Sequence, residues 1–102
     1  MRNALRPHRE LIADFVSGAV TADQFETRYL AQYKADPTLW TQDLFAILDG
    51  LFFHVDDYVS DPDLRARAGG LDGPGLRARA RATLRKLDEY ASQADAGNTD
   101  TP

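Results

Sequence analysis

Four aspartates within eight positions, in the stretch DDYVSDPD, form the densest group of chemically capable side chains in the sequence. They are Asp56, Asp57, Asp61 and Asp63. Carboxylates this close can ligate a hard cation such as Ca²⁺, or they can present negative charge to a basic partner. The spacing departs from that of an EF-hand loop, no glutamate closes it, and Pro62 constrains it. The second role is therefore favoured, and we expect neither a bound metal nor a cofactor.

Signals for catalysis are weak elsewhere in the chain. Neither His8 nor His54 has the histidine four residues away that a helical zinc pair requires. His54 lies three residues before Asp57, so a hydrogen-bonded pair is one reading, but a surface imidazole near acids is favoured. No serine has an adjacent histidine, and there is no cysteine. We predict no catalytic residue and no enzymatic activity.

Charge is distributed unevenly along the chain. Between positions 36 and 63 there are seven aspartates and no lysine or arginine, whereas positions 65–86 hold seven basic residues and one acid. The net charge of −4 argues against nucleic-acid binding, which needs a positive surface. Arginines 77, 81 and 85 recur at helical spacing, which is typical of a solvated helix face. Whether these arginines pair with Asp49 or Asp56 stays open.

The hydrophobic pattern predicts an all-α chain of four helices. Apolar spacing predicts helices over about residues 7–17 and 39–59 and one beginning at Pro74, and a Thr21–Gln24 capping box opens another that ends by Asp36. Residues 60–75 are rich in Pro and Gly and predict an irregular loop. We expect an antiparallel four-helix bundle in a single domain, residues 1–94, with a disordered tail, residues 95–102. No apolar run reaches the length of a membrane span, and the simplest location is the cytoplasm.

In the predicted third helix, apolar and acidic residues occupy opposite faces. The arc expected to be buried contains Leu44, Phe45, Leu48, Leu51, Phe52, Val55, Tyr58 and Val59. Asp49, Phe53, Asp56 and Asp57 lie on the other side. Phe53 has three readings: incidental exposure, packing against the neighbouring loop, or an anchor for a basic protein partner.

The run LFFHVDDYVSDPDLR, followed by GLDGPGLRARARATLRKL, resembles the colicin D immunity proteins and their bacterial self-protective relatives. The resemblance covers about the second half of the chain. It implies a four-helix bundle that binds the nuclease domain of a cognate toxin and blocks its active cleft. In the colicin D case that toxin cleaves tRNA. By position, Asp56, Asp61 and Asp63 fall on acidic places in the family pattern, whereas Asp57 is included by proximity.

The leading hypothesis is an immunity protein whose acidic surface fills the basic cleft of a nuclease toxin. The predicted toxin-binding residues are Asp49, Phe53, Asp56, Asp57, Asp61 and Asp63. The partner is expected to be a basic protein domain, with no nucleic acid and no membrane. The alternatives are a small acidic helical adaptor or regulatory subunit with no toxin partner, and a small metal-dependent enzyme. The sequence makes no prediction of the oligomeric state.

Overall fold

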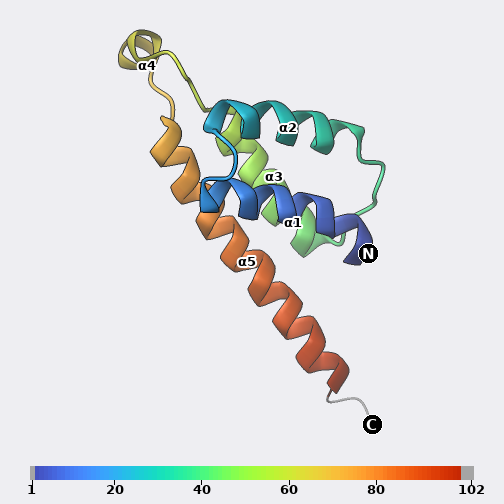
Figure 1. Ribbon diagram of the computed structural model, residues 1–102. Coiled ribbons are helices and arrows are strands. Elements are labelled where there is room, and N and C mark those ends of the chain that lie inside the picture. The colour runs from blue at the N-terminus through green and yellow to red at the C-terminus, as the bar shows by residue number, and fades with distance from the viewer. Residues whose placement is uncertain (1, 100–102) are drawn as a thin grey trace.

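A computed structural model describes the backbone of residues 2–99 and the side chains of residues 5–93. The described part of the chain is all-helical, as predicted, and contains five helices (Figure 1). They are α1 (Arg2–Ser17), α2 (Ala22–Ala35), α3 (Gln42–Asp56), α4 (Pro62–Ala68) and α5 (Gly73–Thr99).

Local sequence signals fix the ends of the first three helices. Gly18 ends α1 with a backbone φ of +90°, a conformation that glycine adopts without steric cost. The predicted capping box at Thr21 is present, with reciprocal hydrogen bonds between Thr21 and Gln24. Thr41 caps α3 by accepting a hydrogen bond from the amide of Leu44 at 3.3 Å.

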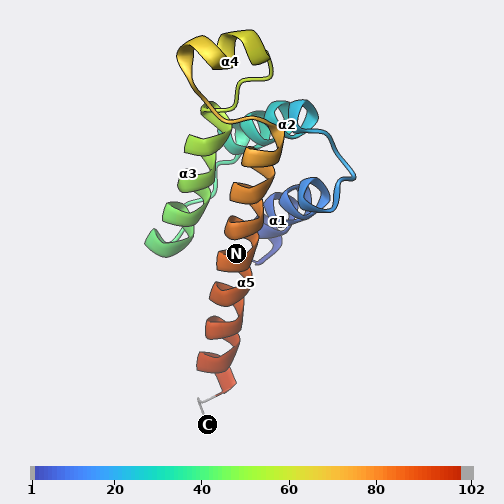
Figure 2. The same cartoon turned by 90° about the vertical axis from the view of Figure 1, so that its left-hand side faces the viewer.

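The helices form two antiparallel pairs that enclose the core. The α1/α2 pair crosses the α3/α5 pair obliquely (Figures 1 and 2). Phe15 of α1 stacks on Phe25 of α2 with ring centroids 4.4 Å apart. The antiparallel four-helix bundle remains a prediction in that specific form, because the pairs cross and a fifth helix is present. The core residues are Leu11, Ile12, Phe15, Val20, Phe25, Tyr29, Leu44, Leu48, Leu51, Val55, Leu76, Ala80 and Leu87.

The third helix is shorter than predicted. It ends at Asp56, and the chain then turns so that the amide of Val59 donates to the carbonyl of Leu71 at 2.9 Å. Phe45 was also predicted to be buried, but half of its surface is exposed. It lies at the edge of the apolar arc, on the side that faces α2 and the α2–α3 connection.

The segment 60–75 is not an irregular loop throughout, and this prediction was wrong. It contains α4, whose first amides are capped by Asp61, with Pro62 at the first helical position. Tyr58 and Leu71 form an isolated parallel bridge on either side of this helix. Figures 1 and 2 show α4 projecting from one end of the molecule.

The last helix is long and extends beyond the others. Asp72 caps its start, accepting a hydrogen bond from the amide of Gly75 at 2.7 Å. The molecule measures 58 × 24 × 23 Å because α5 projects at one end and α4 at the other (Figure 2). The disordered tail over residues 95–102 stays a prediction: the backbone of 95–99 continues α5, and residues 100–102 lie outside the described part.

A candidate acidic interface on the second and third helices

The outer side of α3 carries an exposed aromatic ring beside carboxylates. Phe53 is 75% exposed, and both Asp56 and Asp57 are exposed. These three residues and His54 line an open hollow in the surface. Asp57 is the C-cap of α3, and its amide donates to the carbonyls of Phe53 and His54. The structure therefore brings together three of the six predicted site residues.

Asp49 occupies a different position from its neighbours on α3. It is half-buried, and its Oδ1 accepts a hydrogen bond from the Tyr33 hydroxyl of α2 at 3.1 Å. The Tyr33 ring in turn stacks on Phe52, with centroids 4.8 Å apart. Asp49 therefore faces the junction of α2 and α3 and is held in place by a side chain of α2.

Two acids of α2, which the sequence reasoning missed, join the same surface. Partial burial, and then the negative charges of Asp23 and Asp56, raise the pKa of Glu26 above its usual value. The smaller contribution of Asp56 indicates that Glu26 of α2 lies near an acid of α3. The sequence shows that these two acids lie on α2. It does not show that they join Asp56, because that depends on how α2 packs against α3.

Tyr58 ties the end of α3 to the start of α2. Its hydroxyl donates to Oδ1 of Asp23 at 2.7 Å. Burial, and then this hydrogen bond to a carboxylate, raise the pKa of Tyr58 to about 12. The phenol therefore stays protonated at neutral pH and holds Asp23 within the acidic surface.

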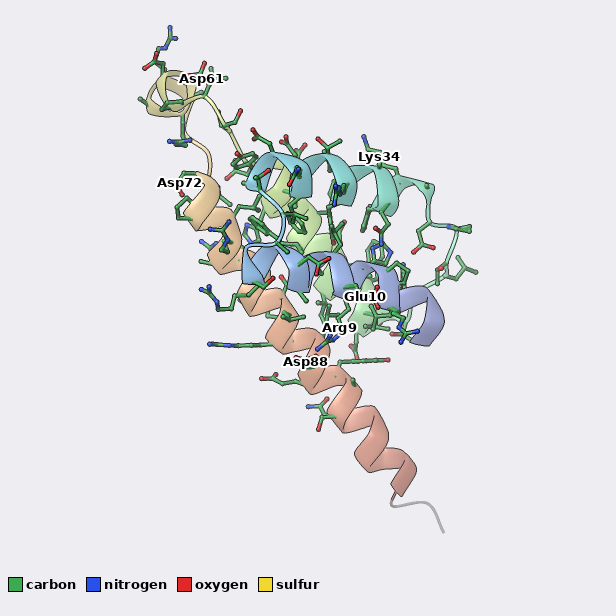
Figure 3. The ribbon with its side chains drawn as sticks, viewed as in Figure 1. Arg9, Glu10, Lys34, Asp61, Asp72 and Asp88 are labelled. Atoms are coloured by element: carbon green, nitrogen blue, oxygen red, sulfur yellow. The ribbon has the colours of Figure 1, made fainter. Side chains whose placement is uncertain are left out.

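Asp61 and Asp63 lie apart from the acids of the helix pairs. Both are exposed, Asp61 as the N-cap of α4 and Asp63 in its first turn, and Asp61 Oδ1 accepts a hydrogen bond from the amide of Asp63 at 2.9 Å. Figure 3 shows Asp61 at the projecting end of the molecule, with Arg9 and Asp88 far from it on the helix pairs. Of the six predicted residues, Phe53, Asp56 and Asp57 thus lie together, Asp49 faces α2, and Asp61 and Asp63 lie at the start of α4.

The basic face of α5 does not cancel these acids by direct pairing. The Arg77 guanidinium donates through Nε to the carbonyl of Phe15 at 3.2 Å and lies 5.0 Å from the centre of the Phe15 ring. Among residues 5–93, no ion pair joins an arginine of α5 to Asp49 or Asp56. The described arginines of α5 therefore do not hold Asp49 or Asp56 in direct ion pairs.

His54 lies between the acidic surface and α5. Burial, and then the positive charge of Arg79, lower the pKa of His54 below its usual value. In the described part of the chain its ring makes no hydrogen bond to Asp57. The imidazole is therefore mainly neutral at pH 7 and adds no positive charge beside Asp56 and Asp57.

Two other kinds of site are absent from the described residues. No group of three His, Asp or Glu side chains is arranged there to hold a metal ion. None of the described helices has the length and apolarity needed to cross a bilayer.

Comparison with known proteins identifies one family. A model of the family described as bacterial self-protective colicin-like immunity matches residues 5–87. The match spans most of the 102 residues and includes α2, α3 and α4 in full. No curated protein and no solved structure matches the chain. The resemblance found in the sequence is thus confirmed at the level of the family.

Proposed function

The chain belongs to the bacterial self-protective colicin-like immunity family, and from that membership we propose that it inhibits a cognate nuclease toxin. The toxin is proposed to be a tRNA-cleaving enzyme of the colicin D type, inhibited in the cytoplasm of the producing cell. The chain acts as a binding protein and not as an enzyme. The proposed contact residues are Asp49, Phe53, Asp56, Asp57, Asp61 and Asp63, together with Asp23 and Glu26.

The observation that carries this proposal is the unneutralised acidic surface of α2 and α3. A nuclease that cleaves RNA needs a positive cleft to hold phosphates. Carboxylates such as Asp56 and Asp57 can occupy the places that phosphates take, and they compete directly with the substrate. The pKa of Glu26 is raised first by partial burial and then by the charges of Asp23 and Asp56, and a basic partner would offset this second contribution.

Charge and apolar contact have separate roles in such a complex. Opposite charges steer the encounter and raise the association rate toward ~10⁸–10⁹ M⁻¹s⁻¹ at low salt. Rapid capture suits an inhibitor of an enzyme that damages the cell that makes it. Long residence requires buried anchors, and Phe53 is the exposed aromatic side chain beside the acids.

The test is titration of the full chain against the nuclease domain encoded beside its gene, followed by calorimetry or surface plasmon resonance. We expect Asp56→Lys to weaken binding by at least about tenfold, with most of the loss in the association rate at low salt. Asp14→Lys is the matched control, since Asp14 is an exposed carboxylate of α1. Absence of binding by the unmodified chain would overturn the proposed function. Equal effects of the two reversals would overturn the proposed surface.

A further inference from the structure

A second hollow in the surface lies beside the connection between α2 and α3. Its volume is about 290 Å³, near the lower end of the range for ligand sites in proteins. The hollow lies near the start of α3, whereas Phe53 lies in the last turn of that helix. Three aromatic side chains and one carboxylate line it: Tyr33, Trp40, Phe45 and Asp36.

The carboxylate of Asp36 has one acceptor position left for a ligand. Its Oδ1 accepts from both the amide and the hydroxyl of Thr38, and its Oδ2 accepts from Nε2 of His8 at 2.7 Å. An ionised carboxylate offers about four acceptor positions, two on each oxygen. One position on Oδ2 is therefore unused by these partners. Since Asp36 lines the hollow and its side chain is 15% exposed, a ligand there can reach it.

The carboxylate also keeps its negative charge. Burial alone would raise the pKa of Asp36, but the hydrogen bonds it accepts lower that pKa overall, so the carboxyl is ionised at neutral pH. The amide nitrogen of Gln32 lies 3.4 Å from Nδ1 of His8, so Nδ1 accepts and the imidazole proton lies on Nε2, toward Asp36. Among residues 5–93, no lysine or arginine forms an ion pair with Asp36, and none lines the hollow.

The aromatic side chains add to the attraction for a cation. An aromatic ring attracts a cation that lies over its face, within about 6 Å of its centre. The Trp40 ring is held by His8, which packs edge-on against it with centroids 5.6 Å apart. The Tyr33 ring is held by its hydroxyl, which donates to Asp49 at 3.1 Å. Two of the three aromatic walls are thus fixed before a ligand arrives.

We propose that this hollow binds a single arginine side chain of a partner protein. A guanidinium group is planar, always charged and weakly hydrated, so it can stack on an aromatic ring while it donates to a carboxylate. Its methylene stem packs best on apolar surface, and Leu39, which is 90% exposed, supplies that surface at the rim. No basic residue lines the hollow to hold the carboxylate of a free amino acid. The arginine is therefore expected within a polypeptide.

The fluorescence of Trp40 tests the proposal directly, because Trp40 is the single tryptophan of the chain. The full chain is titrated with the peptide acetyl-Gly-Arg-Gly-amide, and with the same peptide carrying citrulline, which has nearly the same shape and no charge. Ionic strength is matched with sodium chloride. We expect a saturable change with a dissociation constant of about 0.5–10 mM for the arginine peptide. The citrulline peptide should bind at least about tenfold more weakly.

Two variants locate the site. Phe45→Ala removes one aromatic wall and should weaken binding of the arginine peptide at least about threefold. Phe53→Ala is the matched control, because Phe53 is another exposed phenylalanine of α3 that lies outside the hollow. It should leave the affinity unchanged. In NMR spectra of the unmodified chain, the arginine peptide should shift the indole N–H of Trp40 and the amide of Phe45 but not the amide of Phe53.

Several outcomes would overturn this inference. Equal affinities for the arginine and citrulline peptides would show that charge is not recognised, and no saturable response below about 50 mM would show that no site exists. Equal binding by Phe45→Ala and Phe53→Ala would place the peptide elsewhere. Thermal unfolding verifies that both variants are folded, and the NMR shifts of the unmodified chain test the location without any substitution. The proposed function is decided separately, because none of these measurements uses the toxin domain.

Discussion

Nε2 of His8 lies 2.7 Å from Oδ2 of Asp36, and this buried contact joins α1 to the α2–α3 connection. The His8 side chain is 2% exposed. Its Nδ1 lies 3.4 Å from Nε2 of Gln32, and the ring packs edge-on against Trp40. Asp36 also accepts hydrogen bonds from the amide and hydroxyl of Thr38. The carboxylate thus organises the connection that leads into α3.

Asp36→Asn is expected to destabilise the fold at neutral pH. Burial alone would raise the pKa of Asp36, but hydrogen bonds from Thr38 and His8 outweigh it and hold that pKa below its usual value. Its contribution is therefore present above about pH 3.8 and is lost as the pH falls through the lowered pKa. We expect a loss of about 1–3 kcal/mol in the free energy of unfolding at pH 7.

Urea unfolding of both proteins at pH 7 and at about pH 3 checks this prediction. The difference in unfolding free energy should shrink at the lower pH, because pH 3 lies below 3.8, so the carboxyl is largely protonated in the unfolded chain and part of the stabilisation from its lowered pKa is lost. Asp14→Asn is the control, since Asp14 is exposed on α1. A difference that does not change with pH would contradict the role given to the ionised carboxylate.

Glu26→Gln is expected to stabilise the free protein and weaken its complex. The pKa of Glu26 is raised. Its contribution to the free energy of unfolding is therefore fully present below pH 4.5 and is lost as the pH rises through the raised pKa. Removing the charge should therefore raise the free energy of unfolding at pH 7, by no more than about 0.5 kcal/mol because solvent screens the site.

The same substitution should slow association with the basic toxin domain, because it removes one charge from the α2/α3 surface. Thermal unfolding at pH 7 and at about pH 4 measures the first effect, and stopped-flow association measures the second. Glu10→Gln on α1 serves as the control, because Glu10 pairs with Arg6 and lies outside the acidic surface. A Glu26→Gln variant less stable than the unmodified chain at pH 7 would contradict the mutual repulsion.

Gly50→Ala is expected to stabilise α3. Gly50 lies inside the helix, and a Cβ atom added there would meet no other atom within 4 Å. Alanine should therefore raise the free energy of unfolding by about 0.5–1 kcal/mol, by reducing the freedom of the unfolded chain and favouring helix. Denaturant unfolding measures the gain. A loss of stability would show that the outer face of α3 is more crowded than the structure describes.

Gly70→Ala is expected to open the base of the segment 58–71, here called the arm, where Tyr58 pairs with Leu71 on either side of α4. The added Cβ would lie 2.7 Å from Cγ2 of Val59 and 2.8 Å from the carbonyl oxygen of Asp57, at a backbone φ of +114°. We expect the amides of Val59 and Leu71 to exchange with solvent at least about tenfold faster, with little change in thermal unfolding. Hydrogen exchange followed by NMR measures both amides.

Gly69→Ala distinguishes the effect of backbone strain from the effect of a steric clash with Val59 and Asp57. Gly69 also has a positive φ, of +82°, but an added Cβ would have open space around it. Both variants carry backbone strain, and only the Gly70 variant meets the base of the arm. Equal exchange rates in the two variants would contradict the packing described for Gly70.

Local signals in the sequence predicted the main helices because those signals act over a few residues. The Thr21 capping box and the spacing of Leu44, Leu48, Leu51 and Val55 need no distant partner to be recognised. The early end of α3 depends on pairing with Leu71, and the place of His8 depends on Asp36, 28 residues away. Contacts of that separation leave no periodic trace in one sequence.

The sequence predicted which acids lie on the outer face of the third helix, but it did not predict which residues of other helices lie beside them. Asp56 and Asp57 follow from helical spacing alone. The addition of Asp23 and Glu26 depends on how α2 packs beside α3, and the half-burial of Asp49 depends on Tyr33. Asp61 lies far from the other acids because the parallel pairing of Tyr58 with Leu71 makes α4 project. The Pro- and Gly-rich sequence of residues 60–75 does not indicate that pairing.

The closed base of the arm also bears on how much sequence variation the fold tolerates. Because α4 packs against no other described helix, substitutions on its surface leave the packing of the core unchanged. The outer face of α4 is thus free to vary in sequence without a loss of stability.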